Sequence, residues 1–315
     1  MEQTCEEAID DWFYAQLGII YFIFGKCDIA LSYFEKSLLI AQEQNNRQSE
    51  ATALLNTGQI HEARGNYETA LRYLEQSLEI CREIGDRKAE GVALNNIGQI
   101  HKIRGSYETA LGYFEQSLEI CREIGNRKNE GAALNNIGQI HKKRGVSEAA
   151  LRYLEQSLEI HREIGDRKNE GGALNNISGI YKARGDYEAA LRYLEQSLEI
   201  SHEIGDRKFE GYSLNNISAI YHERGDYEPA LRYLEQSLEI FREIGNRQGM
   251  CTTLFNMGHI HSQNNDHQNA AMHWLKTYRI AKEIGEAQIL SALENLAQQL
   301  GGNDLWDAIA EAMGT

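Results

Sequence analysis

Pairs of adjacent asparagines recur in this chain, and their carboxamides are the groups with the most distinctive chemistry. The pairs stand forty residues apart, at 95–96, 135–136, 175–176 and 215–216. A side-chain amide offers both a donor and an acceptor, so a row of amides can hold the backbone of an extended chain whatever its side chains are. Asn is a mediocre residue inside a helix, and its repeated presence therefore calls for an explanation.

Two roles are open for these amides. In the first, they bind the backbone of a partner segment while variable neighbours select its side chains. In the second, they hydrogen bond to one another between adjacent helices and serve only the fold. We favour the first role. The predicted partner-binding residues are Asn56, Asn95, Asn96, Gln99, Lys102, Asn135, Asn136, Gln139, Lys142, Asn175, Asn176, Lys182, Asn215, Asn216 and Asn256.

The residues beside the amides change from copy to copy, whereas the string "EQSLEI" elsewhere in the repeat scarcely changes. One variable column reads Glu62, Lys102, Lys142, Lys182, His222 and Ser262. Variation concentrated on one face is expected of a surface that selects a ligand. Neutral drift on a solvated face is the alternative interpretation.

Histidines also recur, but their pattern does not predict a metal centre. One column holds His61, His101, His141 and His261, and elsewhere it holds Tyr21, Tyr181 and Tyr221. Metal ligands do not alternate with tyrosine in this way, so we expect these rings to pack. A denser group, His259, His261, His267 and His273, lacks a carboxylate or Cys frame at ligand spacing. We therefore expect neither a metal nor a cofactor.

Catalytic motifs are also missing from the sequence. It contains no P-loop, no dinucleotide fingerprint and no "GxSxG" elbow. Carboxylates such as Glu75, Glu79 and Glu83 fall at helical spacing with Arg nearby, which is typical of a solvated helix face. An arginine column that includes Arg87 and Arg127 follows each helix cap, and ion pairs between repeats are its expected role. We predict a protein that is not an enzyme.

Composition and charge narrow the partners further. The formal charge of −15 at pH 7 disfavours nucleic acids and anionic membranes, which require a basic footprint. No apolar run approaches the ~20 residues that span a bilayer, and the start, "MEQTCEEAIDDWF", is acidic where a signal peptide is basic. Five cysteines without compact spacing do not form a disulfide framework. We expect a reduced, cytoplasmic chain.

The elements that position the amides follow from an internal repeat. The string "EQSLEI" occurs at 75–80, 115–120, 155–160, 195–200 and 235–240, a period of forty without insertion. Degraded copies, "FEKSLLI" at 34–40 and "WLKTYRI" at 274–280, extend the array to seven units.

Each unit splits into two helices, as one copy illustrates. Asn126 follows Gly125, which is a helix stop followed by an N-cap. The first helix is predicted to end at Gly145, and the second to run from Ser147 to Gly165. On a wheel of about 100° per residue, the amides fall on a polar face, away from the apolar packing face.

The residues that carry a family resemblance are Leu94, Ile97, Gly98, His101, Ala110 and Phe114. Their types and spacing resemble the tetratricopeptide repeat. Ser117 stands where that family usually has Ala, Arg122 stands where it has a closing proline, and each unit is six residues longer than the usual 34. In this longer form, the units resemble the arrays of kinesin light chain and of the mitotic-spindle adaptor LGN.

The resemblance implies an all-α fold, a right-handed superhelical solenoid of hairpins whose first helices line a concave wall. Each hairpin leaves an apolar side uncovered, so the units must stack. The predicted repeats are about 10–49, 50–89, 90–129, 130–169, 170–209, 210–249 and 250–285, with degenerate capping helices at 286–315.

The implied function is a scaffold that binds a segment of another protein in the concave groove. An alternative is a regulatory or sensing subunit that docks onto a catalytic partner such as a protease or a kinase and controls it. Self-association is a further possibility, because Trp12, Phe13, Phe22 and Phe24 make the first unit unusually aromatic. The simpler interpretation is that these rings close the N-terminal core.

Overall fold

The computed structural model describes residues 10–300, 302, 305–306 and 308, and every regular element among them is helical. The predicted all-α class is therefore confirmed. The helices are α1 (Asp11–Ile23), α2 (Cys27–Glu43), α3 (Arg47–Ala63), α4 (Tyr67–Ile84), α5 (Arg87–Ile103), α6 (Tyr107–Glu123), α7 (Arg127–Lys143), α8 (Ser147–Glu163), α9 (Arg167–Ala183), α10 (Tyr187–Glu203), α11 (Arg207–Glu223), α12 (Tyr227–Glu243), α13 (Arg247–Gln263), α14 (His267–Ile284) and α15 (Ala287–Leu300).

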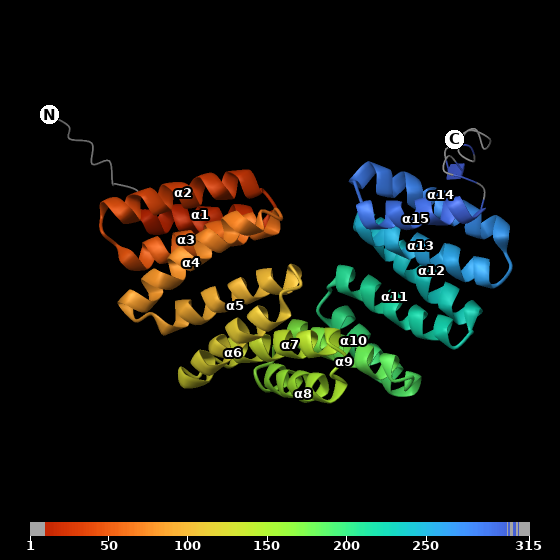
Figure 1. The fold of residues 1–315 in the computed structure, drawn as a ribbon, viewed down its shortest axis with the longest axis horizontal. Coiled ribbons are helices and arrows are strands. Elements are labelled where there is room, and N and C mark those ends of the chain that lie inside the picture. The colour runs from red at the N-terminus through yellow and green to blue at the C-terminus, as the bar shows by residue number, and fades with distance from the viewer. Residues whose placement is uncertain (1–9, 301, 303–304, 307, 309–315) are drawn as a thin grey trace. The chain divides into compact units, whose positions relative to one another are not determined.

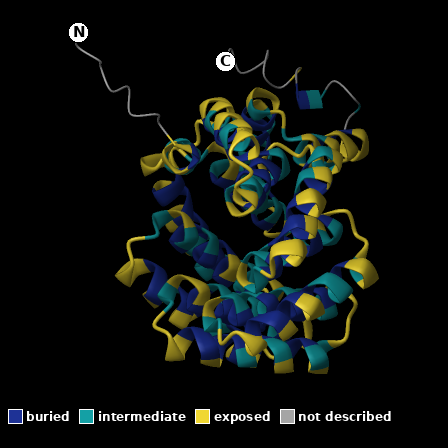
Figure 2. Ribbon diagram, turned by 90° about the vertical axis from the view of Figure 1, so that its left-hand side faces the viewer, coloured by how far each residue is buried: buried dark blue, intermediate teal, exposed yellow. Residues whose placement is uncertain are grey.

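The chain divides into two compact units. Unit 1 ends at Asp166 and contains α1 to α8, and unit 2 begins at Arg167 and contains α9 to α15. Within each unit, consecutive helices pack side by side as hairpins, and each hairpin packs against the next (Figure 1). Buried residues concentrate where helices face one another, while the connections between them are largely exposed (Figure 2).

The junctions between helices combine a glycine and a capping side chain. At Gly85 the backbone takes a φ of +72°, a left-handed conformation that favours glycine and ends α4. The next residue, Asp86, accepts a hydrogen bond from the N–H of Ala89 at 3.0 Å and so caps α5. Gly125 and Asn126 repeat this arrangement before α7, as the sequence predicts.

The two helices of a hairpin approach closely at a glycine. A methyl group added to Gly98 would lie 2.8 Å from the ring of Phe114, which is fully buried. At Gly58 the corresponding neighbours are Leu74 and the carbonyl oxygen of Ala70. The small residue is therefore required because a large side chain from the second helix fills the space over the first.

A serine on each second helix from α2 to α12 ties the hairpin together. The Oγ atom of Ser117 donates to the carbonyl oxygen of Gly91 on α5 at 2.8 Å, and Ser117 is buried. The same bond, with the serine always 26 residues after its acceptor, is made by Ser37, Ser77, Ser157, Ser197 and Ser237. This bond gives serine a physical reason to stand where the resemblance calls for Ala, since a buried hydroxyl needs a partner.

Ion pairs reinforce the contacts within a hairpin and the contacts between neighbouring hairpins. Arg87, for which the sequence predicts pairs between repeats, contacts Glu90 on its own helix at 2.6 Å and Glu123 on α6 at 2.5 Å, so it joins the two helices of one hairpin. Arg82 on α4 makes the connection to the next hairpin, because its Nε atom lies 3.0 Å from Glu90. The buried carboxylate of Glu90 is thus held by two arginines.

The two ends of the described chain differ. Trp12 and Phe24 are 64% and 74% exposed, so these rings do not close the N-terminal core, whereas Phe22 packs against the cluster around Phe34. At the other end, α15 packs on α14, and the Nε1 atom of Trp306 donates to the carbonyl oxygen of Leu293 at 2.8 Å. Residues 1–9 and most of the predicted second capping helix lie outside the described residues.

Stacked rings recur on every hairpin of the two units. The histidine pairs of unit 1 are His61–Tyr73, His101–Tyr113 and His141–Tyr153, with centroids 5.4–5.5 Å apart and planes within 5° of parallel. In unit 2, tyrosine takes the place of histidine in the pairs Tyr181–Tyr193 and Tyr221–Tyr233. These histidines are therefore packing residues. Burial, followed by a nearby arginine, lowers the pKa of each of the three histidines in unit 1.

A matched pair of glycine substitutions tests the close approach. We expect Gly98→Ala to lower the free energy of unfolding by about 1–3 kcal/mol, because the new methyl group overlaps Phe114. Gly112→Ala, in open space on α6, should instead raise it by about 0.5–1 kcal/mol through helix propensity. Urea unfolding followed by circular dichroism measures both, and equal effects would contradict the packing role of Gly98.

The lowered histidine pKa values predict a pH dependence of stability. The unfolded chain binds protons at the ordinary histidine pKa of about 6.5, whereas the folded chain resists protonation. Stability is therefore fully present above this pKa and declines as the pH falls through the lower, folded-state values. Replacing His61, His101 and His141 together by Tyr, the residue at positions 181 and 221 of unit 2, should reduce the loss of thermal stability between pH 7 and pH 5. An unchanged slope would contradict this assignment.

Candidate partner-binding site on the first helices

The predicted site residues of unit 1 lie on three neighbouring first helices, α3, α5 and α7, of which α5 contacts the other two. All are partly buried, neither in the core nor fully exposed. We call this set the unit 1 amide face, and it consists of Asn56, Asn95, Asn96, Gln99, Lys102, Asn135, Asn136, Gln139 and Lys142.

Asn136 is engaged within the fold. Its Nδ2 atom donates to the Oδ1 atom of Asn95 on the preceding first helix at 3.1 Å. Its own Oδ1 atom accepts a hydrogen bond from the Nζ atom of Lys102, also at 3.1 Å. The same ammonium donates to the Oε1 atom of Gln139 at 3.1 Å. Amides of neighbouring first helices therefore form a ladder in which the second Asn of one pair bonds to the first Asn of the preceding pair.

The ladder lacks its acceptor at the N-terminal end of unit 1. The residue that would accept from Asn96 is Leu55, forty-one positions earlier, and the residue that would accept from Asn56 is Ala15. The Nδ2 atoms of Asn56 and Asn96 are accordingly buried without a hydrogen-bond partner. Unlike Asn136, these two amides therefore donate no hydrogen bond in the ladder. An unsatisfied buried donor costs about 1–3 kcal/mol of stability.

Two partly buried groups of opposite charge, Lys102 and Glu62, lie beside these amides. Burial lowers the pKa of Lys102 to about 8, and the charge of Glu62 opposes this shift. Burial in turn raises the pKa of Glu62, and the charge of Lys102 opposes that shift. Glu62 belongs to the variable column of the repeat but is absent from the predicted site residues, and it is the only acidic residue in that column.

The predicted site residues of unit 2 lie on α9, α11 and α13, and they are not equivalent to one another. The ladder continues here, since the Nδ2 atom of Asn216 donates to the Oδ1 atom of Asn175 at 2.8 Å. Lys182 lies 3.0 Å from Glu223. Asn176 and Asn256 are both partly buried.

Asn215 is the one predicted site residue that the structure places in the core. It is 7% exposed, and its Nδ2 atom donates to the hydroxyl oxygens of Ser237 and Thr253 at 2.9 Å. Thr253 stands at the repeat position that is alanine in unit 1, at Ala93 and Ala133. The hydroxyl at this position gives the Asn215 amide a buried partner, and the amide turns inward to reach it.

Among the described residues, no group of three or more His, Cys, Asp or Glu side chains could hold a metal ion. Within the histidine group near the C-terminus, His261 stacks on His273 and lies 3.1 Å from Asp266. Cys27, Cys81, Cys121 and Cys251 are free thiols. No helix in the described part of the chain is long and apolar enough to cross a membrane.

Comparison with known proteins identifies the class. A model of the tetratricopeptide repeat family matches residues 12–83, 90–163 and 170–243. These matches cover more than half of the chain, and the chain belongs to the tetratricopeptide repeat family. No curated protein matches it.

Solved structures share the fold at low sequence identity. BtubC (BKLC) from P. vanneervenii has a TM-score of 0.61 and 17% identity, covering 68% of this chain and 91% of that chain. A signal transduction ATPase with numerous domains (STAND) from Pyrococcus horikoshii, which has a tetratricopeptide repeat sensor, has a TM-score of 0.70 and 18% identity, covering 90% and 44%. The Rap conjugation gene regulator of plasmid pLS20, in complex with the Phr* peptide, has a TM-score of 0.65 and 16% identity, covering 92% and 76%.

The same substitution at two equivalent positions tests the ladder. We expect Asn136→Leu to lower the free energy of unfolding by about 1–3 kcal/mol, because the Oδ1 atom of Asn95 and the ammonium of Lys102 lose a partner. Asn96→Leu removes a buried donor that has no partner and should leave stability unchanged or raise it by about 1 kcal/mol. Urea unfolding of the two variants provides the measurement. Equal losses would show that the two amides do the same work in the fold.

Proposed function

We propose that this protein is a non-enzymatic scaffold that binds an extended segment of another protein along the polar face of its first helices. The observation that carries the proposal is the pair of buried, unpartnered Nδ2 donors on Asn56 and Asn96. Both residues are partly exposed, so rotation of each carboxamide about its side-chain bonds would bring the donor to a carbonyl oxygen of a bound chain.

The spacing of the first helices suits a backbone ligand. Packed helices lie about 8–10 Å apart, and an extended chain advances about 3.3 Å per residue. Amides on adjacent first helices therefore match carbonyl groups about three residues apart in a ligand of polyproline II conformation, whose repeat of three residues turns those carbonyls to the same side. Because these bonds involve only the ligand's backbone, they hold many sequences equally well.

Selection of a particular ligand falls to the residues beside the amides. Lys102 and Glu62 place one positive and one negative group within this face, both partly withdrawn from water. A charged or polar side chain of the ligand at this point would form an ion pair or a hydrogen bond with Lys102 or Glu62. Gln99 and Val92 on α5 supply the neighbouring polar and apolar contacts.

The peptide complex of the pLS20 regulator supports this proposal, since that protein shares the fold and was solved with a peptide. A second candidate function is supported by the STAND protein, in which a tetratricopeptide repeat sensor belongs to a larger signalling ATPase. In this alternative, the chain is a sensing or regulatory subunit that docks onto a catalytic partner, and ligand binding on the first helices changes that partner's activity.

The test begins with affinity capture by the immobilised chain and a scan of overlapping peptides from each captured protein. For the peptide that binds, we expect Asn56→Leu combined with Asn96→Leu to weaken binding at least tenfold, because the carbonyl partners of both donors are lost. Gln76→Ala, on the exposed face of α4, is the control and should leave affinity unchanged. Undiminished binding by the double variant, with the fold intact by circular dichroism, would refute the proposed mode of recognition.

A further inference from the structure

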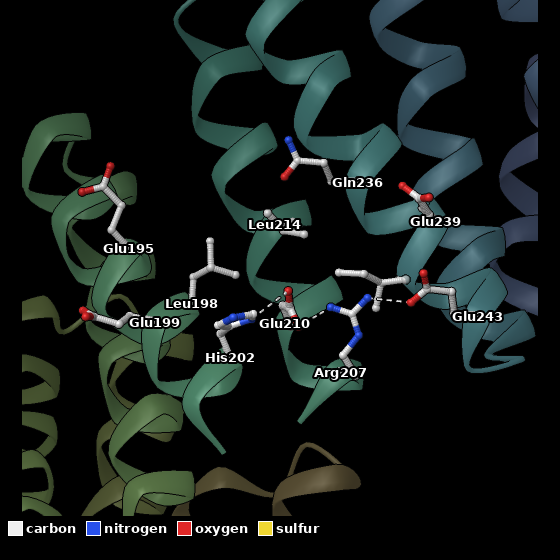
Figure 3. Close-up of a pocket in the computed structure, with 11 residues that line it drawn as sticks. Glu195, Leu198, Glu199, His202, Arg207, Glu210, Leu214, Gln236, Glu239 and Glu243 are labelled. Atoms are coloured by element: carbon white, nitrogen blue, oxygen red, sulfur yellow. Dashed lines mark hydrogen bonds and ion pairs between the residues drawn. The ribbon is translucent and has the colours of Figure 1, made fainter. Parts of the chain in front are cut away.

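A cleft in unit 2 lies outside the amide residues, where two second helices meet over the start of a first helix. It has a volume of about 610 Å³ and is formed by α10, α11 and α12. Leu198, Leu214 and Ile240 supply its apolar lining, and five glutamates also line it. Figure 3 shows Glu195 and Glu199 beyond Leu198 on one side, and Glu239 and Glu243 on the other. The cleft is therefore an apolar hollow with an acidic rim.

Most of the negative charge in this cleft is not neutralised by the chain. Arg207 is committed to two of the glutamates, since it lies 2.7 Å from Glu210 and 2.6 Å from Glu243. The three remaining glutamates are exposed and make no ion pair within the described residues. They are Glu195, Glu199 and Glu239.

At the equivalent positions of unit 1, the glutamate on the first helix contacts a second arginine. There, the Nε atom of Arg82 donates to the Oε1 atom of Glu90 at 3.0 Å, and the Nε atom of Arg122 donates to the Oε1 atom of Glu130 at 3.1 Å. These two carboxylates therefore each receive one guanidinium from their own helix and one from the preceding hairpin.

In unit 2, the second guanidinium is replaced. The residue equivalent to Arg82 and Arg122 is His202. Its Nδ1 atom lies 3.7 Å from the Oε1 atom of Glu210, a contact that is longer than a hydrogen bond and is an ion pair only when the imidazole is protonated (Figure 3). The side chain of Glu210 is nevertheless only 12% exposed. One oxygen of a largely buried carboxylate therefore lacks the guanidinium that its counterparts in unit 1 have.

We propose that this cleft binds an arginine side chain from a partner protein, which takes the place that Arg82 and Arg122 occupy in unit 1. The incoming guanidinium donates to the Oε1 atom of Glu210, and its remaining N–H groups face the rim glutamates Glu199 and Glu239. Its methylene stem packs on the apolar lining. The planar, multiply donating guanidinium fits this arrangement better than an ammonium does.

The charge of the chain favours a basic partner over a second copy. The protein carries a formal charge of −15, so another copy approaching this rim would meet net repulsion, whereas a basic segment would be attracted. The cleft is formed by side chains separate from those of the amide face. Loss of binding at one of these surfaces therefore leaves the other intact, and the two proposals succeed or fail independently.

The experiment uses the full-length chain with methyl-labelled Leu and Ile, titrated with an acetylated and amidated Gly-Leu-Arg-Leu-Arg-Gly peptide and followed by NMR. We expect the methyl signals of Leu198, Leu214 and Ile240 to shift. A peptide with citrulline in place of arginine keeps the shape but lacks the charge, and it should bind at least tenfold more weakly. The lysine peptide should be several-fold weaker than the arginine peptide. Equal binding of the arginine and citrulline peptides, or shifts confined to other methyl groups, would overturn the proposal.

The repeats themselves provide matched variants. His202→Arg restores the arginine that unit 1 has and should weaken peptide binding at least tenfold while preserving the fold, since Arg is native at this position elsewhere. Arg82→His should open an equivalent site in unit 1 and add shifts at Leu78 and Ile120. Binding that is unaffected by His202→Arg, in a variant whose circular dichroism matches the parent, would overturn the proposal.

Discussion

The structure depends on one constraint, which is that a single helical hairpin cannot bury its own apolar surface. Leu94, Ile97 and Ile100 on the first helix α5 are completely buried. The cluster that contains them also draws residues from α3 and α4 of the preceding hairpin and from α6, the second helix of the same hairpin. Stability therefore comes from contacts between each hairpin and the next, as in other repeat proteins. The side chains that join helices, within a hairpin or between hairpins, have partners at sequence distances set by the repeat.

These fixed distances define the contacts of the array. A ring stacks on the residue 12 positions later, a serine hydroxyl donates 26 positions back, and an arginine pairs with a glutamate 36 positions ahead. The amide ladder joins residues 41 positions apart. Because each relation is repeated, any copy that breaks it stands out against its neighbours. The unpartnered donors of Asn56 and Asn96 and the missing arginine at His202 are both exceptions of this kind.

The two proposed sites follow from the same logic on different helices. At the amide face, the exceptional residues present donors that need an acceptor. At the cleft of unit 2, the exceptional residue leaves an acceptor that needs a charged donor. Both surfaces are built on well-packed helices, so the groups that would contact a partner are held in place by the core beneath them rather than by loops.

The sequence by itself determined the elements and their order. The period of forty, the glycine stops with their Asp or Asn caps and the small residue at Gly98 all depend on local conformation or on residue size, and each is read correctly from the chain. The placement of most of the amides on one face of the first helix follows from helical periodicity alone, and the structure agrees with it.

Only the tertiary structure decided which of these amides have partners. Asn96 and Asn136 are indistinguishable within their own repeats, and they differ because the residue 41 positions earlier is Leu55 for one and Asn95 for the other. Asn215 turns inward for a similar reason, since Thr253 on the next first helix offers it a hydroxyl. Sequence patterns specify the face on which a side chain lies. Its hydrogen bonds depend on the residue opposite it, and that is fixed only when neighbouring hairpins pack in register.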